Sequence, residues 1–330
     1  MKQERLYVAP LRIGTRKSAM ALAQTEEIAR CLKTIGTEVE IVRFETTGDV
    51  DQVGRLLPHG GKGGAFVAQI RDAVLGGQLH AAMHSLKDIP GNEDTPGLVI
   101  GATLSRDPPG DVLVLRPGVS LDEIRRARGE GFSIGTNAVR RAAYARKLFP
   151  NIEVVHYRGA ADTRVRKLDA GEKQRLPDGG AVGPADALIM ARSGLERVGL
   201  ASRIAYEFPV AEMLPAVGQG IIAVECAAKD FDTRRILSAI DDGIAHACAD
   251  AEREVLWVLD GHCNSPIAGF AQVSGDQMRL AASVLNHTGS RIIEAQRSGP
   301  ASRPRELGRA VGLELLAKGA ADIIERSRVV

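Results

Sequence analysis

The sequence predicts an α/β fold with mainly parallel sheets, followed by a small C-terminal α+β domain. From residue 11 to about residue 190, strand-like and helix-like stretches alternate, which is typical of parallel sheets with helices on both faces. The last third changes to consecutive strand-like stretches followed by a helix. With 330 residues, the chain is long enough for two or three hydrophobic cores.

The first third alternates between apolar strands and amphipathic helices. Apolar and β-branched stretches predict strands over residues 11–14, 39–44 and 81–84. Apolar residues at helical spacing predict helices over 18–32 and 66–74. Gly36 and the pair Gly76-Gly77 stand where these helices should end. A glycine-rich loop over 48–64 separates the second strand from the second helix.

The middle of the chain repeats this alternation. Strands are predicted over residues 111–115, 132–135, 154–157 and 187–190. Helices are predicted over 137–149 and 162–170, and Ser120 with Glu123 forms a capping box for a short one. The segment 171–184 contains four glycines and two prolines, so we expect an exposed loop there.

The last third predicts the α+β domain. A helix over 244–259 is followed by three strands over 269–273, 278–285 and 291–296. One long closing helix is predicted over 306–326. Consecutive strands followed by a helix indicate a small domain with a three-stranded sheet.

Composition excludes several classes of protein. Hydrophobic residues make up 44% and charged residues 25%, as in soluble globular proteins. The net charge of +2 and 4% aromatic residues argue against a nucleic-acid binder. No segment resembles a signal peptide or a membrane span, so we expect a cytoplasmic protein. The four cysteines form no CxxC pair, so we expect no metal site.

The first candidate site is the segment His84-Ser85-Leu86-Lys87-Asp88, at the end of a buried strand. Catalytic groups of open α/β sheets gather at the carboxyl ends of strands. A carboxylate such as Asp88 can stabilise a developing cation or move protons there. The alternative is an ordinary turn in which Asp88 caps a backbone group.

The second candidate is a set of arginines at junctions between strands and helices. They are Arg16, Arg140, Arg141, Arg158 and Arg164. Guanidinium groups bind carboxylates through two parallel hydrogen bonds, and helix N-termini add partial positive charge. This arrangement favours a substrate with several carboxylates. The alternative is that these arginines form surface ion pairs, as isolated arginines usually do. Their occurrence at four separate junctions between strands and helices makes this alternative weaker.

Two loops add further candidates. The glycine loop around Lys62 is not a nucleotide-binding P-loop, because Leu56 replaces its first glycine and Gly63 its Ser/Thr. It is either a mobile lid or an ordinary surface loop. Cys263, in the sequence Gly-His-Cys-Asn, is either a covalent attachment point or a small buried side chain.

Together these segments closely resemble the porphobilinogen deaminase (hydroxymethylbilane synthase) family, from about residue 11 to about residue 325. The matching segments are LRIGTRKSAMALAQ (11–24), TTGD (46–49), HSLKDIP (84–90), Gly135-Thr136 with Arg140-Arg141, RGAADTRVRKLDAGE (158–172), LPAVGQG (214–220) and DGHCNSPIAG (260–269). The ordered combination is highly specific, although no single segment is.

The resemblance implies three domains, the first two like the lobes of periplasmic binding proteins with the active cleft between them. The implied boundaries are 1–104 with 217–240, 105–216, and 241–330. The resemblance also implies that Cys263 holds a dipyrromethane primer by a thioether. Four porphobilinogen units are then condensed head to tail, each with loss of ammonia, and water releases the linear tetrapyrrole. We expect a monomer that uses no metal.

The resemblance also implies a role for each site residue. Asp88 would stabilise the positive charge that forms on the substrate. Substrate and cofactor carboxylates would be bound by Arg16, Ser18, Lys87, Thr136, Arg140, Arg141, Arg158 and Arg164. Lid and cleft positions would be Asp49, Lys62, Phe66, Gln24 and Gln219.

The chain departs from the family pattern at the carboxylate-binding walls. Asn137 and Ala138 replace two serines, and Ala160 replaces an asparagine. One residue is added before Phe66, and residues 173–184 look like an insertion. Two alternatives therefore stay open: a divergent paralogue acting on a modified pyrrole, and a non-catalytic two-lobed anion-binding protein. A binder, however, needs neither Asp88 nor Cys263.

Overall fold

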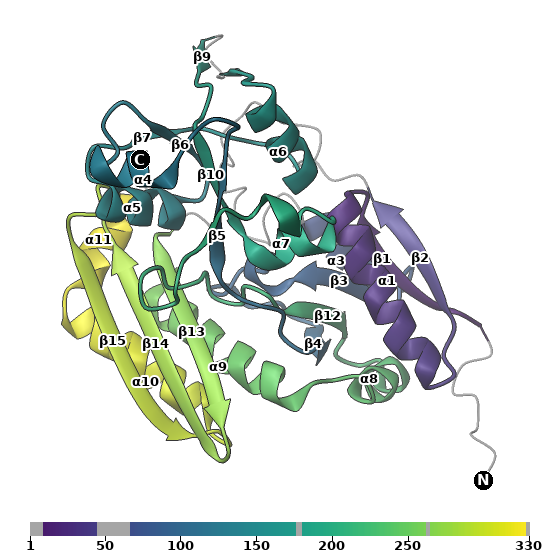
Figure 1. Cartoon of the computed structure of the whole chain (residues 1–330). Coiled ribbons are helices and arrows are strands. Elements are labelled where there is room, and N and C mark those ends of the chain that lie inside the picture. Colours follow the sequence, from purple (N-terminus) through teal and green to yellow (C-terminus); the bar gives the residue numbers. More distant parts are fainter. Residues whose placement is uncertain (1–8, 45–66, 176–179, 262–264, 328–330) are drawn as a thin grey trace.

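The computed structural model describes residues 9–44, 67–175, 180–261 and 265–327, which form three larger sheets, one two-stranded sheet and the surrounding helices (Figure 1). Two sheets have five strands and the third has three. The predicted α/β fold with a small C-terminal α+β domain is confirmed. The boundaries of the three domains stay a prediction.

The first five-stranded sheet is built around strand β3, with strand order β2-β1-β3-β12-β4. Its strands are β1 (Leu11–Arg16), β2 (Val39–Phe44), β3 (Ala81–Ser85), β4 (Leu98–Thr103) and β12 (Ile222–Ala227). Its helices are α1 (Ala19–Thr34), α3 (Ala68–Leu75) and α8 (Phe231–Ser238). β1 runs parallel to β2 and β3, whereas β12 runs antiparallel to β3 and β4. The carboxyl ends of β1 and β3 therefore meet at one edge of the sheet.

The second five-stranded sheet has the order β11-β5-β10-β6-β7. Its strands are β5 (Asp111–Leu115), β6 (Ser133–Gly135), β7 (Glu153–Val155), β10 (Ala187–Ala191) and β11 (Tyr206–Glu207). Its helices are α4 (Leu121–Arg126), α5 (Val139–Leu148), α6 (Ala161–Asp169) and α7 (Arg192–Arg197), with a 3-10 turn over Ala201–Arg203. β6 is parallel to β7 and β10, and β5 is antiparallel to β10.

Within the segment expected to be an exposed loop, β8 (Gln174–Arg175) pairs with β9 (Ala181–Val182). These two short antiparallel strands project from the upper end of the molecule in Figure 1. The loop prediction therefore missed a small hairpin, because two-residue strands have no measurable alternation in sequence.

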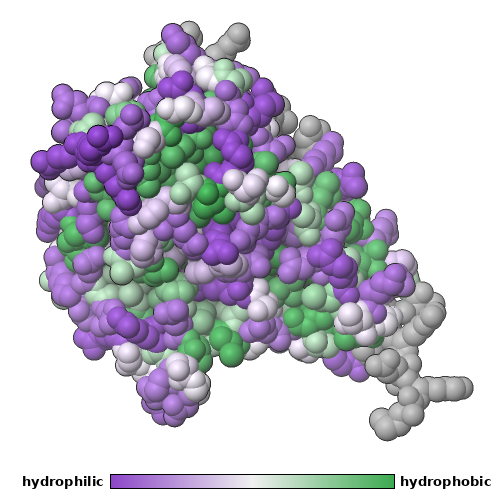
Figure 2. Space-filling model, viewed as in Figure 1, coloured by the Kyte–Doolittle hydropathy of each residue, from purple (hydrophilic) through white to green (hydrophobic). Residues whose placement is uncertain are grey.

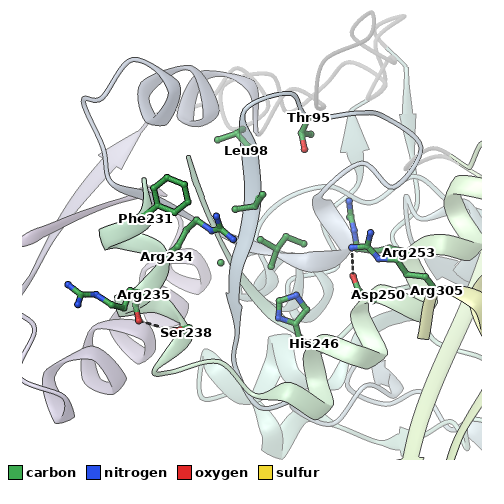
Figure 3. A pocket seen from close by; sticks show the side chains of 13 residues that line it. Thr95, Leu98, Phe231, Arg234, Arg235, Ser238, His246, Asp250, Arg253 and Arg305 are labelled. Carbon is green, nitrogen blue, oxygen red and sulfur yellow. Dashed lines mark hydrogen bonds and ion pairs between the residues drawn. The ribbon is translucent and has the colours of Figure 1, made fainter. Parts of the chain in front are cut away.

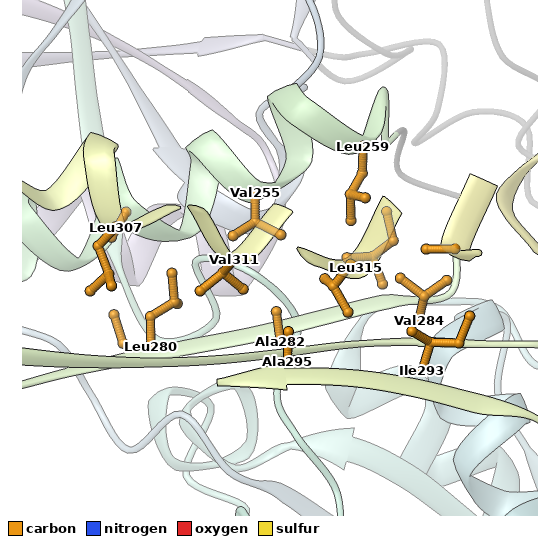
Figure 4. Packing of buried hydrophobic residues seen from close by; sticks show 14 of the residues in the cluster. Val255, Leu259, Leu280, Ala282, Val284, Ile293, Ala295, Leu307, Val311 and Leu315 are labelled. Atoms are coloured by element: carbon orange, nitrogen blue, oxygen red, sulfur yellow. The ribbon is translucent and has the colours of Figure 1, made fainter. Parts of the chain in front are cut away.

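The C-terminal part packs a three-stranded antiparallel sheet against two long helices (Figure 4). Its elements are β13 (Ile267–Ser274), β14 (Gln277–Leu285), β15 (Ile292–Pro300), α9 (Gly243–Leu259), α10 (Pro304–Ala317) and α11 (Ala320–Ser327). Val255, Val311 and Leu280 are fully buried in this core. On the other face of the sheet, the Tyr144 hydroxyl of α5 lies 2.9 Å from the Ser283 hydroxyl. The domain is thereby attached to the second sheet.

The prediction of a single closing helix over residues 306–326 is wrong. The structure has two helices, α10 and α11, which are separated at Gly319. Gly319 has φ +90°, a left-handed conformation that ends a helix and that a glycine adopts without steric cost. The apolar spacing continues across this break, so periodicity alone could not show it.

Hydrophilic residues cover much of the face shown in Figure 2, with smaller groups of hydrophobic residues between them. Within the described ranges, every helix is too short or too polar to cross a bilayer.

Candidate active site

The segment HSLKDIP leaves the centre of the first sheet and carries Asp88 at its edge. β3 ends at Ser85, and Leu86–Asp88 form one 3-10 turn in which Leu86 is buried. The Ser85 hydroxyl donates to Gln24 Oε1 at 3.1 Å, and Gln24 is itself only 2% exposed. The start of the turn is therefore anchored, and Asp88 is partly exposed after it.

The same segment is supported from the C-terminal domain. Arg253 of α9 donates from Nη1 to the carbonyl of Ile89 at 3.2 Å and from Nη2 to that of Pro90 at 3.0 Å. Sequence analysis did not identify Arg253, because it lies 165 positions after Asp88 and in no recognisable motif.

Lys87 is the cation next to Asp88. Burial lowers the pKa of its ammonium to about 8, and repulsion by Arg141 and Arg140 adds to this effect. Attraction by Asp88 and Asp111 opposes the shift. Lys87 thus stays largely protonated at neutral pH, but it loses its charge far more easily than an ordinary lysine.

Arg140 and Arg141 open helix α5 and are both buried against Asp111, the first residue of β5. Arg140 Nη1 lies 2.7 Å from Asp111 Oδ2, and Arg141 Nε lies 2.9 Å from Oδ1. Burial alone would raise the pKa of Asp111, but the two arginines hold it at about 2. Asp111 was missed by sequence analysis. The sequence feature that could have identified it is a single acidic residue at the start of an otherwise apolar strand.

Gln219 joins this buried group to the segments that connect the two large sheets. Its Nε2 donates to Asp111 Oδ1 at 3.1 Å and to the Pro109 carbonyl at 2.6 Å, while its Oε1 accepts from Arg141 Nη2 at 3.2 Å. The two connecting segments also pair directly, since the Asp107 N–H donates to the Gly220 carbonyl at 3.0 Å. Gln219 therefore lies at the junction of the two connecting segments, and its role in the cleft stays a prediction.

The second sheet contributes Arg158 and Arg164 near the start of α6. Arg164 Nε donates to the Gly159 carbonyl at 2.6 Å. Burial lowers the pKa of Arg164 to about 10, repulsion by Arg141 and Arg158 lowers it further, and attraction by Asp88 opposes them. Arg164 is thus close enough to Arg141, Arg158 and Asp88 to interact electrostatically with all three.

These interactions link four predicted cations and Asp88, and one of the cations, Arg141, also pairs with Asp111. Asp88 and Lys87 come from the first sheet, and Arg141, Arg158 and Arg164 come from the second. Because like charges are concentrated and partly desolvated here, the group favours a ligand that carries several negative charges. A cofactor and a substrate that are both rich in carboxylates fit this set of donors.

The other predicted side chains have local partners. Ser18 caps α1, where its hydroxyl accepts from the Ala21 N–H at 3.3 Å, and Arg16 ends the neighbouring strand β1. The Thr136 hydroxyl accepts from the Ala138 N–H at 3.2 Å. Ser18 and Thr136 thus have their described hydrogen bonds at the starts of α1 and α5.

The departures from the family pattern have visible effects. Asn137 accepts the Tyr157 N–H at 2.7 Å and so ties the end of β6 to the segment after β7. Ala138 and Ala160 occupy the N-cap positions of α5 and α6, and neither provides a side-chain acceptor. N–H groups in the first turns of both helices are therefore left without a cap from these residues.

Four predicted residues lie outside the described ranges, namely Asp49, Lys62, Phe66 and Cys263. The described cysteines include two that are unsuited to thiolate chemistry. Burial raises the thiol pKa of Cys226 and of Cys248 to about 11.

Comparisons with known proteins agree along nearly the whole chain. Residues 11–235 match the model of the porphobilinogen deaminase, dipyromethane cofactor binding domain, and residues 246–317 match that of the porphobilinogen deaminase C-terminal domain. The porphobilinogen deaminase of Syntrophobacter fumaroxidans is 37% identical over 96% of this chain and 97% of its own length. Porphobilinogen deaminase 2 of Streptomyces coelicolor is 39% identical over 96% of each chain.

Among solved structures, a methionine-binding protein covers 70% of this chain and 89% of its own, with 15% identity and a TM-score of 0.40. A similarity this low supports no further statement. The two domain matches and the full-length relatives coincide with the segments that carry Asp88 and the surrounding cations. The chain belongs to the porphobilinogen deaminase family.

Proposed function

We propose that this chain is a hydroxymethylbilane synthase that condenses four porphobilinogen molecules head to tail, with Asp88 as the catalytic carboxylate. Family membership makes it a transferase with a dipyrromethane cofactor. One observation carries the assignment of the site: Asp88 of the first sheet interacts with Arg141 and Arg164 of the second. A carboxylate surrounded by carboxylate-binding cations suits a substrate that carries both acids and a developing cation.

Each condensation breaks the bond between the aminomethyl carbon and the nitrogen of one porphobilinogen, and ammonia leaves. The carbon then bonds to a free pyrrole α-carbon, which loses a proton. When bound, the dipyrromethane supplies the first such α-carbon. Asp88 stabilises the positive charge left on the substrate by ammonia loss, because its carboxylate is partly exposed at the end of β3 and close to the cations that bind the substrate's acids.

The acetate and propionate groups of the pyrroles are bound by the cations and by polar groups at the strand ends. The residues assigned here are Arg16, Ser18, Lys87, Thr136, Arg140, Arg141, Arg158 and Arg164. Arg140 and Arg141 are held by Asp111, so they add charge and donors from fixed positions. The N–H groups at the starts of α5 and α6 supplement them, since Ala138 and Ala160 do not cap them.

The remaining roles complete the proposal. Cys263 attaches the cofactor, Asp49, Lys62 and Phe66 belong to the lid, and Gln24 and Gln219 support the cleft. We further infer that the enzyme acts as a monomer in the cytoplasm. The alternatives of a modified-pyrrole paralogue and a non-catalytic binder are not favoured, because relatives named as porphobilinogen deaminases match 96% of the chain.

Asp88→Asn tests the catalytic assignment. The substitution removes the charge of the side chain and keeps its shape. We expect kcat to fall by about 100-fold or more, because the positive charge on the substrate is no longer stabilised by a carboxylate. The measurement is the rate of ammonia release from porphobilinogen, with four ammonia molecules per tetrapyrrole in the parent. Turnover near the parent rate would mean that another group stabilises the cation.

Helix α6 offers a matched pair for testing carboxylate binding. Arg164→Gln should raise KM about tenfold or more, because it removes a charged donor near Asp88. Arg166→Gln should leave KM unchanged, since Arg166 is exposed and pairs with Glu172 at 2.6 Å. Steady-state kinetics with porphobilinogen compare the two variants. Equal KM values would exclude Arg164 from substrate binding.

A further inference from the structure

A cavity of about 870 Å³ lies apart from the proposed cleft, bordered by β4, α8, α9 and α10 (Figure 3). β4 is an edge strand of the first sheet. Phe231 and Arg234 of α8 border one side of the strand in Figure 3, while His246 and Asp250 of α9 and Arg305 of α10 border the other. The proposed reaction uses none of these residues.

The lining is strongly positive. Four arginines and one carboxylate are among the residues that border the cavity. Arg305 Nη2 donates to that carboxylate, Asp250 Oδ1, at 3.1 Å, and Arg234 Nη1 donates to the Ala228 carbonyl at 3.1 Å. A guanidinium has five N–H donors, so both arginines keep donors for an anion. Arg235, in contrast, points away from β4 in Figure 3.

The cavity also has an apolar side. Leu98, Val99 and Ile100 of β4 contribute to it, and the Phe231 ring is 73% exposed beside them. The volume is in the range of pockets for small organic ligands. An inorganic anion would leave this apolar side in water, whereas an organic acid would cover it. The lining therefore favours carboxylates on a carbon skeleton.

Arg253 connects this cavity to the proposed catalytic segment. It borders the cavity and also donates to the carbonyls of Ile89 and Pro90, the two residues after Asp88. Burial lowers the pKa of its guanidinium, repulsion by Arg71 and Arg305 adds to this effect, and attraction by Glu225 and Asp250 opposes it. An anion in the cavity would offset the repulsion between Arg253 and Arg305 and compete for the same donors.

We propose that this cavity binds a small organic polycarboxylate through Arg234, Arg253 and Arg305, and that binding shifts the Asp88 segment through Arg253. The second half rests on the proposed role of Asp88, whereas the binding half does not. The site thus has the geometry of a regulatory site for an acidic metabolite, separate from the cleft.

Binding is tested by calorimetric titration of the full-length protein with citrate. Arg234→Gln and Arg305→Gln should each weaken one citrate-binding event at least tenfold. Arg309→Gln is the matched control, because Arg309 lies one turn further along α10 and pairs with Glu254 of α9, outside the cavity lining. It should bind citrate as the parent does. Equal citrate affinity in all four proteins would overturn the site.

Inorganic phosphate tests the chemical class in the same titrations. Phosphate should bind this site at least tenfold more weakly than citrate, because it leaves the apolar side exposed. Phosphate affinity equal to that of citrate, and lost in Arg305→Gln, would overturn the organic class.

Coupling is tested by hydrogen exchange of the peptide that contains residues 86–92. Saturating citrate should change its exchange rate at least twofold in the parent and in Arg309→Gln. Citrate should leave the exchange rate unchanged in Arg305→Gln. It should also leave the rate unchanged in Arg253→Lys, because a lysine keeps the positive charge but cannot bind the carbonyls of both Ile89 and Pro90. Citrate binding without any change in the parent would overturn the coupling but not the binding site. Neither result depends on the turnover of Asp88→Asn.

Discussion

Lys87 illustrates how neighbouring residues change the properties of a common side chain. Burial desolvates its ammonium, the cations Arg141 and Arg140 repel it, and the anions Asp88 and Asp111 attract it. Burial dominates, and the resulting pKa of about 8 falls within the range in which enzymes are assayed. Substrate binding should therefore depend on pH in a way that an ordinary lysine would not produce.

We predict that kcat/KM for porphobilinogen decreases above about pH 8, up to tenfold per pH unit, as Lys87 loses its proton. The sign follows from the lowered pKa, since the charge that binds carboxylates is present below pH 8 and lost above it. In Lys87→Arg the group stays charged, so this decrease should disappear from the profile whatever the absolute rate. The same break near pH 8 in both proteins would assign it to another group.

At this scale, sequence patterns identified residues that belong to short specific segments. Asp88, Lys87, Arg141 and Arg164 were all named from the sequence, and in the structure Lys87 and Arg164 each interact electrostatically with Asp88 and Arg141. Asp111 and Arg253 could not be predicted in the same way, because their importance comes from partners far away in the chain. Asp111 pairs with arginines 29 and 30 positions later, and Arg253 supports carbonyls more than 160 positions earlier.

Among the elements, strands with non-local partners were hardest to predict. β12 is the antiparallel partner of β3, although about 140 residues separate them. Its apolar run, Ile222–Ala227, is short and has no alternation, so strand and buried helix could not be told apart. Helix α8 was also missed, although Asp230 caps it by accepting from the Thr233 N–H at 3.0 Å. That capping residue was a usable signal.

The break between α10 and α11 leads to a stability prediction. Gly319→Ala should lower the free energy of unfolding by about 1 kcal/mol, because an L-residue is strained at φ +90°. Gly243→Ala is the control, since Gly243 begins α9 with no neighbour within 4 Å of an added Cβ and no positive φ. Urea denaturation of both variants provides the comparison. Equal stability of the two would contradict the backbone explanation for the two helices.

For the whole molecule, Glu252 holds the three sheets in a fixed relationship. It is fully buried on α9 and accepts from the Gly218 N–H at 2.7 Å, from the Ala271 N–H of β13 at 2.8 Å and from Arg106 Nη1 at 2.5 Å. Arg106 and Gly218 lie on the two segments that connect the large sheets. The C-terminal domain, which contains Cys263 in the sequence, is thereby attached at the junction between the proposed lobes.

The overall architecture could be predicted because the alternation of strands and helices, and their order along the chain, determine which sheets form. The relative placement of the sheets could not, because it depends on contacts such as that of Glu252 with Arg106, which no local pattern encodes. A covalent cofactor on Cys263 requires all three parts of the molecule, because the thiol of the C-terminal domain and the cations near Asp88 must act in the same reaction.

The most direct test of this claim is the intact mass of the freshly purified protein and of Cys263→Ala. The account predicts that the parent exceeds the mass of its bare chain by two linked pyrrole units, and that Cys263→Ala has the bare mass and no turnover. Cys31→Ala, which changes a cysteine of α1, is the control and should keep the added mass. A parent with the bare mass, even after incubation with porphobilinogen, would contradict the account.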